Sequence, residues 1–458
     1  MVEIEEQLSG LIQKLKRDQR NFMLLSYTEK ILFQDPIAFF ENGKALFEKR
    51  FFWSSADQDF SVVGLGSVAR LTGSQDRFMN VEEKWHEILT TIFIENPYTI
   101  PGTGPVIMGG FSFHEQEQLD GIWADFEHNE MVLPQIILTN YRGNSYITHQ
   151  IPIRVEQTAE KIMEQINEHR LHTLKPRSEM RQAECILKQD LNPDAWKDLV
   201  KFATDEIKKG SFSKVVLARE LRATYDQNVS PASVLMNLVE EQHHSYIYAF
   251  ESNGTCFVGA SPERLVKVED NCLLSTCLAG TAPRGGTVSE DEKIGQELLK
   301  DRKNLQEHAY VVDMIRQAVE SCCDEVDIPD GPVLLPLKNL QHLYTPVRGK
   351  LKEGKTLLHV VKQLHPTPAL GGEPRNEALH FIRQYERLNR GWYAGPVGWM
   401  DASGNGEFAV AIRSALLNGN QASLFAGCGI VRDSDPEEEF KETEIKLTPM
   451  LSALGGWK

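Results

Sequence analysis

The spacing of hydrophobic and polar positions along the chain predicts a mixture of helices and strands. Near the start, apolar residues recur every three or four positions, as on one face of a helix from residue 3 to about 20: Ile4, Leu8, Leu11, Ile12 and Leu15. Apolar runs at 60–64 and 106–111 predict strands, and 131–154 predicts two strands joined by a turn at 141–144.

A polar stretch at 172–190 is the best candidate for a boundary. It separates an N-terminal region, residues 1–180, from a C-terminal domain, residues 190–458. Just beyond it, Asn192 can cap a helix that stops at Gly210.

Further on, the pattern predicts a strand at 214–219, a helical region at 291–322, and a hairpin of strands 393–400 and 407–417. Strand runs mix with long helices without a regular βαβ alternation, which favours the α+β class.

Composition narrows the class of partner. The chain has 458 residues, with 49 Lys and Arg against 65 Asp and Glu, and a formal charge of −16. Nucleic acid and anionic membranes need basic patches, so neither is expected as the main partner, although a small anionic substrate remains open. The sequence shows no apolar run long enough to span a membrane and no secretory signal, and its seven cysteines include no CxxC. We therefore expect a reduced, cytoplasmic protein without disulfides or a zinc site.

The segment from Gly64 to Ala69 fits the dinucleotide-binding fingerprint G-x-G-x-x-A. No clean βαβ unit surrounds it, because the polar stretch 71–76 interrupts the helix that such a site requires. A tight turn after a strand is the preferred interpretation.

An acidic run near the C-terminus carries more information. Asp435 begins a helix on which Glu439, Glu442 and Lys446 share one face. Such a pattern usually marks a solvated face with a weak ion pair. Here, however, the helix also carries apolar residues and follows a buried strand at 425–431. Two carboxylates one turn apart beside apolar surroundings suit Mg²⁺, which binds one or two carboxylates together with substrate oxygens.

Other charged residues lie in apolar surroundings. Glu307 aligns with the apolar stripe of its helix, so it must be neutral, paired or bound to metal, whereas the neighbouring His308 is predicted to be a core histidine. Arg413 in an apolar strand either pairs with a buried acid or binds a ligand carboxylate. Lys214 and Glu263, taken singly, are unremarkable.

Read together, these segments resemble the chorismate-utilising enzyme family, over roughly the last 265 residues and in the family's order. The matching stretches are Phe212–Arg219, Gly259–Glu263, Leu278–Gly285, Gln306–His308, His365–Gly372, Tyr393–Trp399 and Glu439–Glu444. The resemblance implies an anthranilate synthase-like fold of two facing antiparallel sheets flanked by helices, with the N-terminal region part of the same fold. It also implies Mg²⁺. The most similar branch converts chorismate to isochorismate, an isomerisation in which water attacks C2 and the C4 hydroxyl leaves, and the N-terminal part resembles the menaquinone-pathway form.

By motif, Lys214 would be the base that activates water and Glu263 the acid that protonates the departing hydroxyl. The resemblance assigns Mg²⁺ to Glu307, Glu439 and Glu442. It assigns substrate binding to Gly280, Ala369, Tyr393, Arg413, Gly427 and Lys446. A glutamate can act as the acid only if its pKa is raised towards neutrality, by burial or by nearby negative charge.

Two positions separate the alternatives within the family. Relatives that use ammonia have an amide residue where this chain has Lys214, and aminodeoxychorismate synthases have a lysine nucleophile where it has Ala279. Both differences favour water as the nucleophile and predict no obligatory glutamine amidotransferase subunit. A salicylate synthase, which goes on to eliminate pyruvate, and a siderophore-pathway isochorismate synthase remain open. So do two other classes, a chorismate-binding subunit that docks an amidotransferase and a non-catalytic Mg²⁺-dependent metabolite binder.

Overall fold

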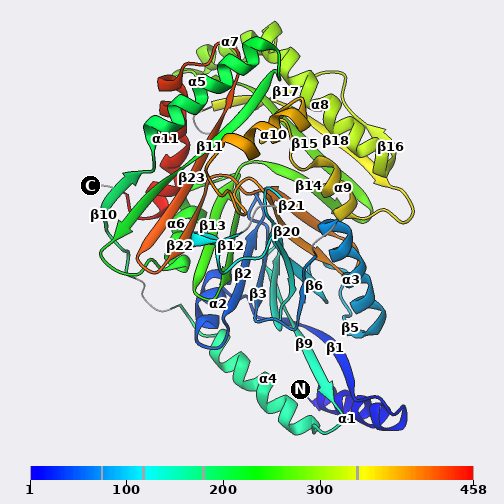
Figure 1. The fold of residues 1–458 in the computed structure, drawn as a ribbon. Helices are drawn as coiled ribbons and strands as arrows, with labels where there is room; N and C mark the ends of the chain where they lie inside the picture. Colours follow the sequence, from blue (N-terminus) through cyan, green and yellow to red (C-terminus); the bar gives the residue numbers. More distant parts are fainter. Residues whose placement is uncertain (1, 74–75, 116–118, 178–180, 337–339, 457–458) are drawn as a thin grey trace.

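Two large β-sheets with helices packed against them form the protein (Figure 1). The computed structural model describes residues 2–73, 76–115, 119–177, 181–336 and 340–456. The predicted α+β class with two facing sheets is confirmed.

The first sheet has 13 strands, and it combines strands from before residue 180 with strands from after residue 190. In spatial order they are β10 (Cys185–Asp190), β11 (Lys214–Tyr225), β23 (Gln421–Ile430), β22 (Ser414–Asn418), β13 (Thr255–Ser261), β12 (Tyr246–Ser252), β2 (Lys49–Ser54), β3 (Phe60–Leu65), β8 (Ile136–Tyr141), β9 (Asn144–Arg154), β1 (Phe22–Ile31) and β5 (Ile92–Glu95), with β19 (Gly372–Glu373) also paired to β11. Its strands pair antiparallel except β1 and β5, which run parallel, so the expectation of purely antiparallel sheets is wrong at this edge.

The second sheet has 10 strands and draws on both parts of the chain in the same way. Its order is β16 (Cys323–Asp327), β18 (Leu340–Leu351), β15 (Cys272–Pro283), β14 (Arg264–Glu269), β21 (Gly406–Val410), β20 (Pro396–Asp401), β6 (Val106–Phe111), β7 (Asn129–Leu133) and β4 (Ala69–Leu71), with β17 (Val333–Pro336) paired to β18. The two sheets share a core, in which Phe60 of β3 stacks on Trp399 of β20 with ring centroids 4.8 Å apart.

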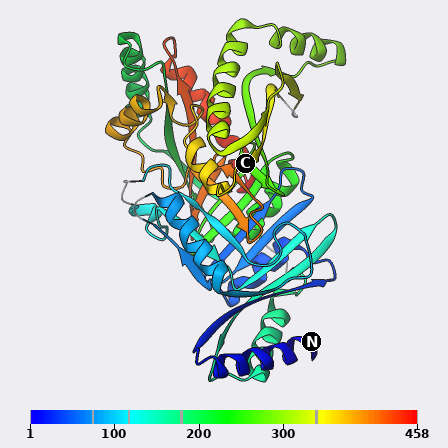
Figure 2. The same ribbon diagram turned by 90° about the vertical axis from the view of Figure 1, so that its right-hand side faces the viewer.

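Helices pack against both sheets. They are α1 (Val2–Arg17), α2 (Pro36–Asn42), α3 (Arg77–Thr91), α4 (Ala159–Thr173), α5 (Pro193–Lys209), α6 (Pro231–Glu241), α7 (Val288–Leu298), α8 (Arg302–Cys322), α9 (Leu357–Leu364), α10 (Arg375–Tyr385) and α11 (Pro436–Ala453), with short 3₁₀ turns at Gly43–Ala45 and Gly121–Trp123. Figure 2 shows α1 and α4 together at one end of the molecule, where they form a separate apolar cluster with β1 and β9. Within the described residues, every helix falls short of the length and apolarity needed to cross a membrane.

Most of the predicted elements are present, including the N-terminal helix, the strands at 60–64 and 106–111, and the turn at 141–144. The Gly64–Ala69 segment is the expected turn, with Gly66 at φ 73° directly after β3. The predicted cap at Asn192 is wrong. Its backbone is left-handed, with φ 52°, and its side chain accepts no hydrogen bond from the first turn of α5, since capping requires an extended backbone there.

The predicted helical region at 291–322 is two helices, because the helical conformation is interrupted between α7 and α8. Asp301 caps the second helix by accepting a hydrogen bond from the Asn304 N–H at 2.7 Å. The predicted strand at 407–417 is also wrong as a single element. It is β21 followed by β22, which belong to different sheets, and Arg413 lies between them with a left-handed backbone at φ 51°. Both strands are buried and apolar, so the sequence pattern runs through the change of sheet without interruption.

Two of the places where the chain crosses between the sheets are adjacent. One crossing follows β13, where Glu263 precedes β14, and the other contains Arg413 between β21 and β22. The Ala260 N–H donates to the Arg413 carbonyl at 3.1 Å, and the Val410 N–H donates to the Glu263 carbonyl at 3.1 Å. These two hydrogen bonds hold Glu263 and Arg413 in the same region.

The start of α11 yields a stability prediction. Asp435 accepts hydrogen bonds from the Glu437 and Glu438 N–H groups at 3.0 and 3.1 Å. Because Asp435→Ala removes this cap, we expect the free energy of unfolding to fall by about 1 kcal/mol in urea titrations. The exposed Asp433 is the control, and Asp433→Ala should leave stability unchanged. Equal stability of the two variants would mean that the cap contributes nothing.

Candidate active site

A cavity of about 210 Å³ lies beside the two crossings. Its wall includes six of the predicted site residues: Glu263, Ala369, Tyr393, Arg413, Gly427 and Lys446. It also includes residues that the sequence did not single out: Val216, Leu370, Arg390, Ala394, Ile412, Phe425 and Ala426. Residues more than 200 positions apart in the sequence therefore meet at one site.

Lys214 begins β11, two residues before Val216, so both side chains project from the same side of the strand. The lysine side chain passes over Gly429 of the neighbouring strand β23. A Cβ atom on Gly429 would lie 2.7 Å from Lys214 Cε, so only glycine leaves room for this path. The charge of Lys214 also lowers the pKa of Glu263, which places the two groups within electrostatic reach of each other.

Glu263 is fixed by its backbone at the first crossing. Its N–H donates to Ser261 Oγ at 3.2 Å, and its carbonyl accepts the bond from Val410. Burial raises the pKa of the Glu263 carboxyl to about 7, although Lys214 opposes that rise. A substantial fraction of Glu263 is therefore protonated at neutral pH and able to donate a proton.

Arg413 and Tyr393 supply the polar groups of the apolar wall. Arg413 Nη1 donates to the Lys446 carbonyl at 3.1 Å, and the Tyr393 ring stacks on Phe425 at 5.4 Å. Burial lowers the pKa of Arg413, while Tyr393 and Glu442 raise it, and an arginine stays charged at neutral pH. Burial raises the pKa of Tyr393, so its hydroxyl remains a neutral donor.

One face of α11 lies along β23 at the edge of the cavity. Lys446 Nζ donates to the Gly427 carbonyl at 3.0 Å and pairs with Glu442 Oε1 at 2.6 Å. The pKa of the Cys428 thiol is raised by burial and also by the charges of Glu439 and Glu442, so both carboxylates act on the same point of β23. Glu439, Glu442 and Lys446 therefore share one face of α11, as the sequence predicts.

Glu307 lies in α8, but its side chain is outside the part of the chain that the structure describes. Among the described side chains, no group of three or more His, Cys, Asp or Glu is placed to hold a metal ion. Even without Glu307, the carboxylates of Glu439 and Glu442 are hard oxygen donors. Mg²⁺ binds such a pair when a substrate supplies further oxygens. The donor set fits the predicted ion.

Gly280 does not line the cavity. It lies in β15, where the register shifts between Leu278 and Thr281, and its φ of 81° is the left-handed conformation that favours glycine. The connection to the site runs through His342. Burial lowers the pKa of His342, the Gly280 backbone raises it and the charge of Arg413 lowers it.

His308 is the core residue that the sequence predicts. It is buried, with Nδ1 3.0 Å from the Ala279 carbonyl and Nε2 2.7 Å from Thr345 Oγ1. The Nδ1–H therefore donates to the carbonyl and Nε2 accepts from the threonine, which leaves the imidazole neutral.

Arg390 is the most informative residue that sequence reasoning missed. It lines the cavity, and its side chain is buried in an ion pair with Glu386. The available signal was a lone arginine directly before the glycine- and aromatic-rich segment 391–400, where a charge requires a buried partner.

Comparisons with known proteins identify the family. The family model described as chorismate binding enzyme matches residues 10–455. The isochorismate synthase MenF of Bacillus subtilis (strain 168) is 42% identical over 448 residues, covering 96% of this chain and 95% of that protein. The salicylate biosynthesis isochorismate synthase of Pseudomonas aeruginosa is 36% identical over 415 residues, covering 88% and 85%. The solved structure of MenF, the menaquinone-specific isochorismate synthase from Escherichia coli, has a TM-score of 0.78 at 25% identity and covers 98% of this chain and 99% of that one. The chain belongs to the family of chorismate-binding enzymes.

Proposed function

We propose that this protein is an isochorismate synthase, an isomerase that converts chorismate to isochorismate by adding water at C2 and releasing the C4 hydroxyl. The observation that carries the proposal is that Glu263, which lines the cavity and has a pKa raised to about 7, lies within electrostatic reach of Lys214. Water is a poor nucleophile and hydroxide a poor leaving group, so the reaction needs both a base and an acid. The 42% identity to an isochorismate synthase over nearly the full length supports the same assignment.

In this reaction Lys214, once deprotonated, takes the proton from the attacking water. Protonated Glu263 gives its proton to the departing C4 hydroxyl, which leaves as water. The two groups come from different elements, β11 for Lys214 and the β13–β14 crossing for Glu263. Their separation in the fold allows one group to work at C2 and the other at C4.

The substrate carries two carboxylates, so the −16 chain must supply positive charge locally. Arg413 and the Tyr393 hydroxyl bind the enolpyruvyl carboxylate. Lys446 faces the ring carboxylate beside the Gly427 backbone. Ala369 completes the wall around the ring.

Glu439, Glu442 and Glu307 would hold Mg²⁺, which neutralises the ring carboxylate and lowers the barrier to losing the hydroxyl. Glu442 also pairs with Lys446 on the same helix face, with Oε1 2.6 Å from Nζ, so the carboxylate that would bind the metal lies beside the cation that faces the substrate.

We further propose that the product feeds menaquinone synthesis in the cytoplasm, without an obligatory amidotransferase subunit. The similar solved structure from Escherichia coli is that of a menaquinone-specific isochorismate synthase. All seven cysteines are free thiols, as is usual in a reducing compartment. A pull-down from cell extract that recovers a dedicated glutamine amidotransferase would contradict the last part of this proposal.

The function is tested by incubating the protein with chorismate and Mg²⁺, with and without ammonium, and identifying the products. Isochorismate supports the proposal. Salicylate with pyruvate would instead identify a lyase, and anthranilate an ammonia-using enzyme.

The metal assignment predicts a changed Mg²⁺ requirement. Glu307→Gln and Glu442→Gln each remove one hard ligand, so we expect the Mg²⁺ concentration for half-maximal activity to rise by at least about tenfold. Chelator should abolish wild-type activity and added Mg²⁺ should restore it. Glu444 is exposed on the same helix, so Glu444→Gln is the matched control and should titrate like the wild type. Identical titrations for all variants would mean that the glutamates are structural.

The raised pKa of Glu263 predicts the pH dependence. Because the acid must be protonated, we expect kcat/KM to fall as the pH rises through about 7. Glu263→Gln should lower kcat by about 10²-fold and lose this alkaline decline. A variant that keeps the same decline would show that another group causes it.

Stability provides a second measurement on Glu263. Between its usual pKa of 4.5 and its folded pKa of about 7, the native carboxyl keeps a proton that the unfolded chain has lost. Stability contributed by this group therefore falls as the pH rises through that window. The Tm of Glu263→Gln relative to wild type should accordingly be higher at about pH 8 than at about pH 5. A constant difference in Tm would mean that the carboxyl is not perturbed.

The base assignment predicts a change of nucleophile. Lys214→Gln removes the base but leaves an amide that can orient an incoming molecule, and ammonia needs positioning more than deprotonation. We expect this variant to lose most isochorismate formation and to gain ammonia-dependent turnover of chorismate to an amino-substituted product, increasing with pH as ammonium loses its proton. The double variant Lys214→Gln, Glu263→Gln should lose that turnover. Near wild-type isochorismate formation by Lys214→Gln would exclude Lys214 as the base.

A further inference from the structure

The Arg390–Glu386 ion pair is buried directly beside the cavity. Arg390 Nε and Nη2 donate to the two carboxylate oxygens of Glu386 at 2.6 and 2.8 Å, and the side chains are only 1% and 3% exposed. Arg390 also forms part of the cavity wall, although the mechanism above gives it no role.

The pair is bound to the strand that carries the proposed base. Arg390 Nη2 donates to the Val216 carbonyl at 2.7 Å, and Glu386 Oε2 accepts from the Ala218 N–H at 2.8 Å. Val216 and Ala218 lie two and four residues beyond Lys214 on β11. Both partners of the ion pair therefore hold the backbone of this strand.

The same arginine also holds the neighbouring segment of the cavity wall. Arg390 Nη1 donates to the Leu370 carbonyl at 3.3 Å, and Leu370 and its neighbour Ala369 both line the cavity. One guanidinium group thus connects β11 with the segment 365–371, which also meets β11 directly where the Val216 N–H donates to the Gly371 carbonyl at 3.0 Å.

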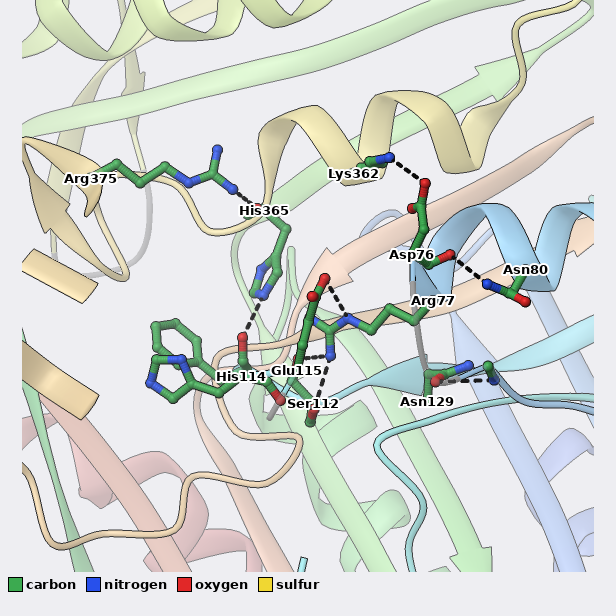
Figure 3. Close-up of polar contacts among 12 residues, drawn as sticks. Asp76, Arg77, Asn80, Ser112, His114, Glu115, Asn129, Lys362, His365 and Arg375 are labelled. Carbon is green, nitrogen blue, oxygen red and sulfur yellow. Dashed lines mark hydrogen bonds and ion pairs between the residues drawn. The ribbon is translucent and has the colours of Figure 1, made fainter. Parts of the chain in front are cut away.

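The N-terminal part of the chain supports this connection from behind. The Arg390 guanidinium lies over the Phe113 ring, 4.3 Å from its centroid. His365, at the start of the 365–371 segment, donates from Nε2 to the Phe113 carbonyl at 3.2 Å, while Arg375 donates to the His365 carbonyl (Figure 3). The segment is therefore held at both ends, at His365 and at Leu370.

A buried ion pair adds little net stability, because removing both charges from water offsets most of their attraction. The geometry of the arginine, in contrast, is fully used: its planar fork binds two carboxylate oxygens and two carbonyls from separate segments. A lysine ammonium has three donors on a single atom and cannot reproduce these directions. The arrangement suits a group that fixes relative position.

We propose that the Arg390–Glu386 pair is a positioning centre that sets β11, with Lys214, against the 365–371 segment, with Ala369. It holds the base at its working distance from the bound ring. This inference rests on the proposed function, since it assigns the pair a task in that reaction.

The test is Arg390→Lys, which keeps the charge and loses the fork. We expect kcat to fall by about 10- to 100-fold, because small displacements of a catalytic group are costly, while the KM for chorismate changes by less than about fivefold. Glu386→Gln should likewise lower kcat more than it changes the KM for chorismate. It serves as the test if Arg390→Lys does not fold. When Lys214→Ala is already present, adding Arg390→Lys should lower kcat by a further factor of less than about three, because the base that Arg390 positions is already gone.

Arg50 provides a matched control. It is another buried arginine, on β2, where it pairs with Glu251 and donates to the Phe40 carbonyl at 2.7 Å. Arg50→Lys should lower Tm to a similar extent and leave kcat within about twofold of wild type. An equal loss of kcat in Arg50→Lys would overturn the proposal.

Two further results would also overturn it: folded Arg390→Lys with kcat within about threefold of wild type, or a loss that multiplies fully with that of Lys214→Ala. The wild-type product is determined separately. If the wild type makes a product other than isochorismate, the proposed function fails, but the same ratios for that product still test the positioning role.

Discussion

The chain leaves one sheet and enters the other twice within one small region, after β13 and after β21, and two backbone hydrogen bonds join these crossings. A strand that changes sheet cannot continue its ladder, so its polar groups need other partners and its side chains turn towards the space between the sheets. Glu263 lies at one crossing and Arg413 at the other. The left-handed backbone of Arg413 is a strained conformation for a non-glycine residue. Such strain is found at functional sites, where it fixes the direction of a side chain, here the guanidinium.

The electrostatics of the site follow from this burial. The chain carries a charge of −16, yet the cavity wall brings together Arg390, Arg413 and Lys446. Glu263 is the acidic group of that wall, and burial raises its pKa to about 7. Desolvation therefore does two things in one place. It gives a glutamate the proton that an acid needs, and it strengthens the attraction of the cations for an anionic substrate.

Much of the fold could be predicted from the sequence because periodicity reports burial, and burial defines most of these elements. The helices that carry Glu307 and Glu442 and the strand that begins at Lys214 were predicted on that basis. The break at Arg413 could not be predicted, because β21 and β22 are both apolar and the pattern does not record which sheet a strand joins. Gly280 was assigned to the substrate by motif, and the register shift of β15 between Leu278 and Thr281 that contains it could not be predicted from the sequence pattern.

The same limit applies to the buried ion pairs. A sequence indicates that Arg390 must find a partner. Only the folded chain specifies that this partner is Glu386, four residues earlier, and that the guanidinium also donates to the carbonyls of Val216 and Leu370. Glu263 is unremarkable in the sequence when taken singly, and it was singled out only through the family motif. The predicted site is incomplete where the role depends on neighbours brought together by the topology.

The N-terminal region has a role in the site even though the predicted catalytic residues all lie beyond it. Strand β2 pairs with β12, and β6 pairs with β20, the strand that follows Tyr393 by three residues. Without these partners, two strands at the centre of the protein would become open edges, with unpaired backbone groups and exposed apolar faces. Phe113, directly after β6, also supports Arg390 and binds His365. The first part of the chain therefore extends both sheets and supports the cavity wall, so the site depends on contacts from outside the last 265 or so residues that carry the family motifs.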